Sequence, residues 1–265
     1  LIGDAAVGMH PVTAHGFNLG LQSQATLAQL VTDAARRGGD IAAPALLRLG
    51  GDRLPDKYAA ALRRFKHGNG VSKVDMALDG PIPWTDPVLR EAPTLHLGGT
   101  REQIAAAERE VSRGRIPERP YLLVVQPSVA DASRAPDGKH VLWAYGHVPY
   151  GSDVDITQTA ITMIEQHAPG FRDLVLASTA TRAVDFEHTV SANFAGGDFS
   201  SGAVTMAQML KRPVVSPTPW RTPVKGVYLG SGATTPGPSV HGMAGWHAAR
   251  TLLADRGLSA PDLGL

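Results

Sequence analysis

Cysteine is absent from this chain of 265 residues. Its absence excludes disulfide bonds, a cysteine nucleophile, thiolate metal sites and a redox-active disulfide, because each of these needs a thiol. Long apolar runs are missing as well, and no stretch approaches the roughly 18 residues of a membrane-spanning helix. We therefore expect no transmembrane segment, which leaves peripheral contact with a membrane open.

An excess of charge of either sign is also lacking. The 25 lysines and arginines nearly balance the 24 aspartates and glutamates, so the net charge is +1 and gives no electrostatic case for nucleic acid. Hydrophobic residues make up 43% of the chain and charged residues 18%, which is typical of a globular protein with a core. The length allows one large or two small domains and leaves the oligomeric state open. No signal peptide is visible, so we expect a cytoplasmic protein.

The most informative stretch is rich in glycine and covers residues 226–246. Its segment 227–229 is apolar and β-prone, which predicts a buried strand. Gly230 and Gly232 follow, and glycine lets the backbone approach a ligand closely. From about Gly242 the pattern becomes helical, and the N-terminus of such a helix favours an anionic or carbonyl-rich ligand. The alternative is an ordinary turn with packing glycines, since the third glycine of the dinucleotide fingerprint is absent.

A longer motif surrounds these glycines. It runs Pro223-Val224-x-Gly226-Val227-Tyr228-Leu229, then Pro236-Gly237, then Val240-His241-Gly242-Met243-x-Gly245-x-x-Ala248-Ala249-Arg250. It resembles the C-terminal flavin motif of phytoene-desaturase-like oxidoreductases of the pyridine nucleotide-disulfide oxidoreductase domain-containing protein 2 type, and this resemblance extends over about residues 46–265. The resemblance implies an FAD cofactor that is contacted by Gly230, Ser231, His241, Gly242 and Met243.

A second flavin-type motif lies in roughly the first 45 residues. It comprises Gly3-Asp4-Ala5-Ala6, Pro11 and Gly16-Phe17-Asn18-Leu19-Gly20-Leu21, and it resembles the C-terminal FAD motif of aromatic-ring hydroxylases. The resemblance implies that Asp4 bonds the ribityl chain or the diphosphate end of FAD, whereas the residue alone would equally fit an Asx turn. Cofactor contacts are likewise implied for Gly3, Pro11, Gly16 and Asn18. Val7 and the pair Ala14-His15 depart from the pattern of that class.

The middle of the chain predicts a separate, strand-rich domain. Alternating or continuous apolar patterns predict strands at residues 71–78, 95–99, 121–126, 140–148 and 173–181. Leu123 is expected to be buried, and Thr100 with Gln103 predicts a capping box before a helix over 101–112. We expect an α/β fold of α+β character. Its parts are an incomplete, Rossmann-like FAD-binding lobe (residues 1–52 and 186–265) and a substrate domain with a mixed or antiparallel sheet (residues 53–185).

No residue pattern identifies a catalytic side chain. The histidine pairs His10/His15 and His241/His247 do not place two imidazoles on one helical face, so we expect no metal site. A flavin ring can accept electrons without a dedicated protein acid or base, so an unidentified catalytic residue is compatible with an enzyme.

Four further residues leave two explanations open. Trp84, Trp143 and Tyr145 either line an apolar channel or belong to the core of the sheet. Asp198 either borders a substrate channel or caps a turn.

The Gly-x-Gly-x-x-Gly loop that holds the FAD pyrophosphate, and the acidic residue that follows it, are not found in this sequence. Together with a start at Leu1 instead of methionine, this predicts a fragment or fusion product that binds FAD weakly or not at all. Three functions remain. They are an FAD-dependent oxidoreductase that takes hydride or electrons from a small apolar substrate, an FAD-dependent aromatic-ring monooxygenase, and a non-catalytic binding or scaffold protein that has lost the cofactor.

Overall fold

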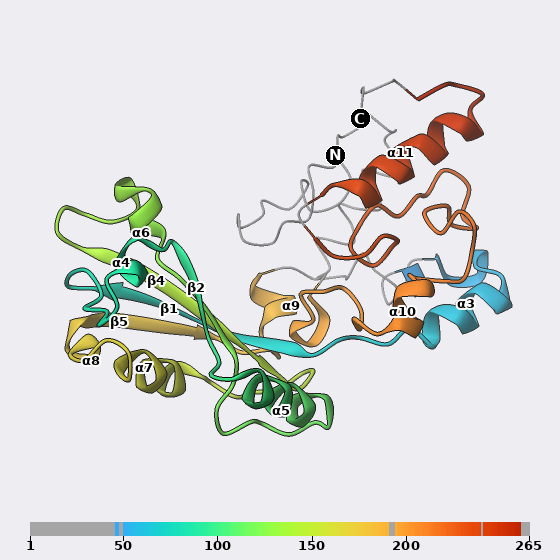
Figure 1. Ribbon diagram of the computed structural model, residues 1–265. Coiled ribbons are helices and arrows are strands. Elements are labelled where there is room, and N and C mark those ends of the chain that lie inside the picture. Colours follow the sequence, from blue (N-terminus) through green and yellow to red (C-terminus); the bar gives the residue numbers. More distant parts are fainter. Residues whose placement is uncertain (1–45, 48–49, 191–193, 240, 261–265) are drawn as a thin grey trace. The chain divides into compact units, whose positions relative to one another are not determined.

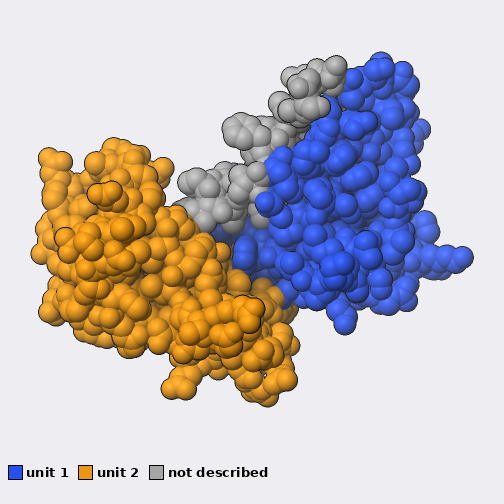
Figure 2. Space-filling view, viewed as in Figure 1, with its two compact units in different colours: residues 1–68, 190–265 blue, residues 69–189 orange. Residues whose placement is uncertain are grey.

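The computed structural model describes residues 46–47, 50–190, 194–239 and 241–260. The chain divides into two compact units (Figure 2). We call residues 1–68 with 190–265 the split unit and residues 69–189 the inserted unit. The sequence prediction placed these boundaries after residues 52 and 185. Residues 53–68 lie in the split unit instead, because Leu54 and Leu62 pack with Leu229 in its apolar core.

One five-stranded antiparallel sheet forms the centre of the inserted unit (Figure 1). The strand order is β2-β3-β4-β1-β5, and every pair of neighbours is antiparallel. The strands are β1 (Gly70–Leu78), β2 (Thr94–Leu97), β3 (Leu122–Val125), β4 (His140–Val148) and β5 (Val175–Thr181). The predicted sheet is therefore confirmed as an antiparallel one, and the α/β class with α+β character is confirmed with it.

Helices connect and cover these strands. They are α4 (Val88–Glu91), α5 (Arg101–Ser112), α6 (Pro127–Ala130), α7 (Thr157–Glu165), α8 (Phe171–Leu174), α9 (Phe186–Thr189) and the 3-10 turn η3 (Ala132–Arg134). The predicted capping box of α5 is confirmed, since the Gln103 N–H donates to Thr100 Oγ1 at 3.3 Å and the Thr100 N–H donates to Gln103 Oε1 at 2.8 Å. In the described part of the chain no helix is long and apolar enough to cross a membrane.

The core of the inserted unit lies between one face of the sheet and α7. Val74 and Leu78 of β1 are fully buried there, together with Ile164 of α7. Leu122 and Val124 of β3 point into the same core. Leu123 was expected to be buried, but it lies on the opposite face of the sheet and is only half-buried. The apolar run in β3 has no alternation, so its pattern did not reveal which face would be covered.

The split unit has little regular structure in its described part. Its helical elements are η2 (Gly51–Arg53), α3 (Asp56–Arg63), η4 (Ala195–Gly197), α10 (Met206–Leu210) and α11 (Met243–Asp255). No β-strand occurs among its described residues. Its Rossmann-like character therefore stays a prediction, and its described residues outside these helices lie mostly in turns and loops.

Candidate functional site

The glycine-rich segment follows a tight reversal of the chain. Tyr228 forms an isolated antiparallel bridge with Arg221, a few residues earlier. The strand predicted over residues 227–229 is therefore wrong, because this short reversal allows a single bridge and contains Pro223, which has no N–H to donate. Leu229 alone of the three predicted strand residues is buried, and the loop begins directly after it.

We call residues 230–237 the glycine loop. The Ser231 carbonyl accepts hydrogen bonds from the N–H of Thr234 at 3.0 Å and from its hydroxyl at 2.8 Å. The Ser231 hydroxyl oxygen accepts from the N–H of Ala233 at 3.2 Å. Within the described ranges, no residue accepts a hydrogen bond from the N–H groups of Ser231 and Gly232 or from the Ser231 hydroxyl. The loop thus has unpaired donors for a ligand that carries oxygen or nitrogen acceptors.

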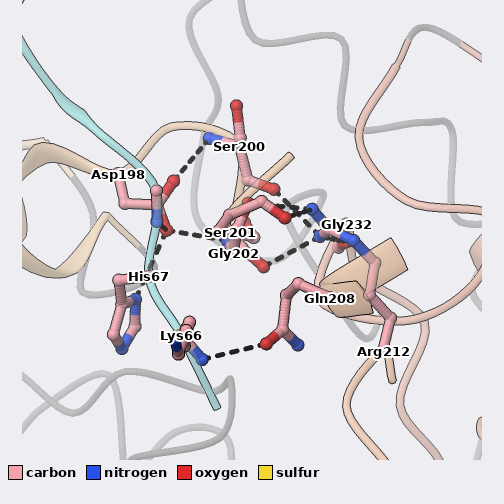
Figure 3. A network of polar contacts seen from close by, with 11 residues as sticks. Lys66, His67, Asp198, Ser200, Ser201, Gly202, Gln208, Arg212 and Gly232 are labelled. Carbon is pink, nitrogen blue, oxygen red and sulfur yellow. Dashed lines mark hydrogen bonds and ion pairs between the residues drawn. The ribbon is translucent and has the colours of Figure 1, made fainter. Parts of the chain in front are cut away.

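The side chain of Arg212 supports this loop from a fully buried position (Figure 3). Its Nη1 donates to the Gly232 carbonyl at 2.6 Å. Nη1 also donates to the carbonyls of Ser200 at 3.2 Å and Ser201 at 3.1 Å, and Nη2 donates to those of Gly202 at 2.8 Å and Ala203 at 3.3 Å. Burial lowers the pKa of the guanidinium, and the negative charge of Asp198 opposes that shift. Arg212 therefore connects the glycine loop to residues 200–203.

A second buried charge, Asp198, lies in the same network (Figure 3). Its carboxylate accepts hydrogen bonds from the N–H groups of Ser200 at 3.1 Å, Gly202 at 2.7 Å and Gly68 at 2.8 Å. The Nδ1 atom of His67 lies 3.4 Å from the same carboxylate. Of the two roles that the sequence left open for Asp198, the structure shows the capping of a turn.

The second predicted group of cofactor residues lies at the start of α11. The helix begins at Met243, close to the predicted position, after Gly242 in the left-handed conformation with φ of 64°. His241 Nδ1 accepts the N–H of Met243 at 3.0 Å. The imidazole thus satisfies one of the N–H groups that a helix start leaves unpaired, so this N–H is not offered to a ligand.

Trp220 connects the two groups. Its indole N–H donates to the Thr235 carbonyl in the glycine loop at 2.7 Å. Its ring stacks on His247 of α11, with centroids 4.5 Å apart and planes inclined by 22°. One aromatic side chain therefore contacts both parts of the candidate site.

The predicted contacts Gly230, Ser231, His241, Gly242 and Met243 all lie among the described residues of the split unit, and that they share one cofactor site stays a prediction. The predicted contacts near the N-terminus lie outside the described residues; they are Gly3, Asp4, Pro11, Gly16 and Asn18. Sequence reasoning missed Arg212 and Trp220, since an isolated arginine and an isolated tryptophan in a proline-rich segment carry no spacing signal.

The aromatic residues proposed for a channel belong to the inserted unit. Trp84 is fully buried and its indole N–H donates to Gln126 Oε1 at 3.0 Å, so Trp84 is a core residue. Trp143 is also buried and stacks on the half-buried Tyr145, with centroids 6.2 Å apart. Searched over the described residues, the structure has no group of three or more histidine, aspartate or glutamate side chains that could hold a metal ion.

Comparison with known proteins identifies relatives of both predicted kinds. The chain is 28% identical over 223 residues to the rat pyridine nucleotide-disulfide oxidoreductase domain-containing protein 2, which covers 76% of this chain and 38% of that protein. It is 51% identical over 71 residues to ubiquinone hydroxylase UbiM of Neisseria meningitidis, which covers 27% of this chain and 14% of that protein. Ubiquinone hydroxylase UbiL of Rhodospirillum rubrum is 55% identical over 47 residues, or 18% of this chain and 11% of that protein.

No protein-family model matches the chain. A crystal structure of an oxidoreductase from Methanosarcina mazei aligns with a TM-score of 0.48 at 17% identity, over 81% of this chain and 42% of that one. The chain spans well under half the length of the curated relatives it matches. Both predicted resemblances are nevertheless confirmed: the chain is homologous to a protein named for an oxidoreductase domain and to ubiquinone hydroxylases.

Proposed function

We propose that this chain forms the flavin-ring end of an FAD-dependent oxidoreductase that oxidises a small apolar organic substrate. The observation that supports this most is the set of unpaired donors at Ser231 and Gly232 in the segment that resembles a flavin motif. A flavin ring carries carbonyl and ring-nitrogen acceptors, so this donor set fits it. Bound FAD would supply the redox chemistry, because its isoalloxazine ring takes up the electrons.

The residues of the split unit then have distinct tasks. The glycine loop would bind the ring through main-chain and hydroxyl donors, while His241 fixes the first turn of α11 beside its left-handed Gly242. We assign no residue to proton transfer, because no contact among the described residues places an acidic or basic side chain beside the N–H and hydroxyl donors of the glycine loop. The inserted unit is proposed to bind the substrate.

A second candidate is an FAD-dependent aromatic-ring monooxygenase. This candidate is favoured by the 51% identity to a ubiquinone hydroxylase, which extends over 71 residues of the chain. NADPH oxidation that requires both oxygen and an aromatic substrate, and that yields a hydroxylated product, would select this candidate. A non-catalytic protein that has lost the cofactor is the third candidate.

Titration with riboflavin and FAD, followed by flavin fluorescence, tests the proposed site. We expect the two ligands to bind the 265-residue chain with similar, modest affinity, because the sequence offers no glycine-rich pyrophosphate loop. Gly242→Val should abolish binding, since valine is strained at a positive φ. Gly257→Val is the matched control, because Gly257 has φ of 69° at the far end of α11 with open space around it.

Each outcome of this titration points to one conclusion. FAD that binds far more tightly than riboflavin would contradict the incomplete site and show that other residues hold the pyrophosphate. Binding that survives Gly242→Val would move the flavin away from α11. Failure of the wild-type chain to bind either ligand would favour the non-catalytic protein.

A further inference from the structure

Three polar groups of the split unit are connected in series at the glycine loop. The guanidinium of Arg212 donates to the Gly232 carbonyl at 2.6 Å. The N–H of the same peptide group, which belongs to Ala233, donates to the Ser231 hydroxyl oxygen at 3.2 Å. Hydrogen bonds in such a series polarise one another in a low-dielectric interior, so the buried positive charge acts on the hydroxyl through the peptide.

These contacts determine whether the Ser231 hydroxyl can donate or accept a hydrogen bond with a ligand. A serine hydroxyl has one hydrogen to donate and accepts through its oxygen. The oxygen of Ser231 already accepts from Ala233, and its main chain is fixed by the two hydrogen bonds from Thr234. No acceptor for the hydroxyl hydrogen lies among the residues that the structure describes. Among the described residues the hydrogen is therefore left available for an acceptor of a ligand.

We propose that Arg212 is a positioning residue for flavin recognition: through the Gly232 peptide it holds the Ser231 hydroxyl as a donor to an acceptor atom of the isoalloxazine ring. This inference rests on the proposed flavin site. Arg212 is fully buried and bonds main-chain carbonyls, so it acts through Ser231 and does not contact the ligand.

The geometry needs arginine and not merely a positive charge. The guanidinium reaches the glycine loop at Gly232 and the segment 200–203 at the same time, because its donors are arranged in a rigid fork. A lysine ammonium is a compact charge with three donors and cannot span both segments. Arg212→Lys therefore keeps the charge and loses the alignment of the Gly232 peptide.

Riboflavin binding to the full chain tests the proposal, because riboflavin carries the flavin ring without the pyrophosphate. We expect Ser231→Ala to weaken binding about tenfold, the loss of one polarised hydrogen bond. Arg212→Lys should weaken it by a similar factor. The double variant should bind no more weakly than either single one, because both changes remove the same interaction. Ser231→Thr keeps the hydroxyl and should retain most of the affinity.

Thr205→Ala is the control for a loss of stability without a change in the loop. Thr205 caps α10, where its hydroxyl oxygen accepts the N–H of Gln208 at 3.2 Å, and it takes no part in the hydrogen-bond series. This variant should bind riboflavin like the wild-type chain. Urea unfolding of every variant shows which of them are folded under the conditions of the titration.

The outcomes separate the two levels of the argument. A wild-type chain that does not bind riboflavin overturns the proposed function and this inference with it. Wild-type binding that Ser231→Ala leaves unchanged, or losses that add in the double variant, overturn only the role of Arg212 and Ser231. An equal loss in Thr205→Ala would assign the effect to stability and overturn it too. If Arg212→Lys does not fold, equal affinity of Ser231→Thr and Ser231→Ala overturns the inference.

Discussion

In the inserted unit, apolar side chains of the sheet and of α7 form one continuous core. The described part of the split unit has a much smaller apolar cluster, which includes Leu62 and Leu229. It also has two buried charged side chains, Asp198 and Arg212, that form hydrogen bonds with main-chain groups of several loops. The comparison shows two ways to fix a backbone. Regular strands need only a covered apolar face, whereas irregular loops depend on particular polar side chains, so single polar substitutions should affect the candidate site most.

Removing the buried charge of Arg212, which bonds the loop carbonyls, should cause the largest loss of stability. Arg212→Met should lower the free energy of unfolding by about 3–5 kcal/mol, because each buried group left without its partner costs about 1–3 kcal/mol and water compensates some of them. Urea unfolding followed by circular dichroism measures it. A loss below about 1 kcal/mol, on the same estimate, would mean that apolar packing alone holds these loops.

Shortening a core side chain tests the other half of the comparison. Leu122→Ala should cost about 2–5 kcal/mol, since Leu122 is fully buried in the core of the sheet. Leu123→Ala serves as the control, because the neighbouring leucine lies half-buried on the opposite face. Equal losses in urea unfolding would contradict the register of β3.

Loss of the N-cap of α5 should have a smaller effect on stability. Thr100→Ala removes the capping oxygen of α5 and should cost about 1 kcal/mol. Ser112→Ala, at the far end of the same helix, removes only a hydrogen bond from an exposed hydroxyl to the Arg109 carbonyl and should be nearly neutral. Thermal unfolding compares them, and a neutral Thr100→Ala would mean that tertiary packing alone fixes the start of α5.

The smallest effect is expected at the surface, where Asp255 of α11 bonds the Arg221 guanidinium and the Tyr228 hydroxyl. Both partners favour the carboxylate and lower the pKa of Asp255 below its ordinary value. Its contribution is therefore present at neutral pH and is lost as the pH falls through the lowered pKa. The protection of backbone N–H groups at the end of α11 against hydrogen exchange, relative to their intrinsic rates, should fall over that acidic range in the wild-type chain. Asp255→Asn should remove this dependence, and an identical profile in both proteins would contradict it.

Much of the inserted unit could be predicted from the sequence, because its signals are local. The predicted bounds of β4 agree with the structure, since an apolar, β-prone run fills residues 141–145 within this strand. The capping pair Thr100 and Gln103 fixed the start of α5. In β3 the apolar run carried no alternation, and the buried face was therefore misjudged at Leu123.

The candidate site was only partly predictable. The motif indicated the glycine loop and the start of α11, because glycines with unusual backbone conformations such as Gly242 leave a trace in the sequence. Arg212 left none, since its importance arises from carbonyls at residues 200–203 and 232, which any residue type supplies. The strand expected over 227–229 failed because its pairing depends on a turn that the apolar pattern does not encode.

The position of the inserted unit in the chain also bears on how the split unit assembles. The hydrogen bond from the Gly68 N–H to Asp198 joins residues 130 positions apart, which is a long loop to close. In the sheet, however, Lys73 of β1 lies opposite Thr181 of β5, so the folded sheet brings its own two ends together. Each halving of the remaining loop lowers the entropic cost of closure by about 0.6 kcal/mol. If the sheet forms first, it therefore holds the two chain segments of the split unit near each other and raises the effective concentration of each for the other.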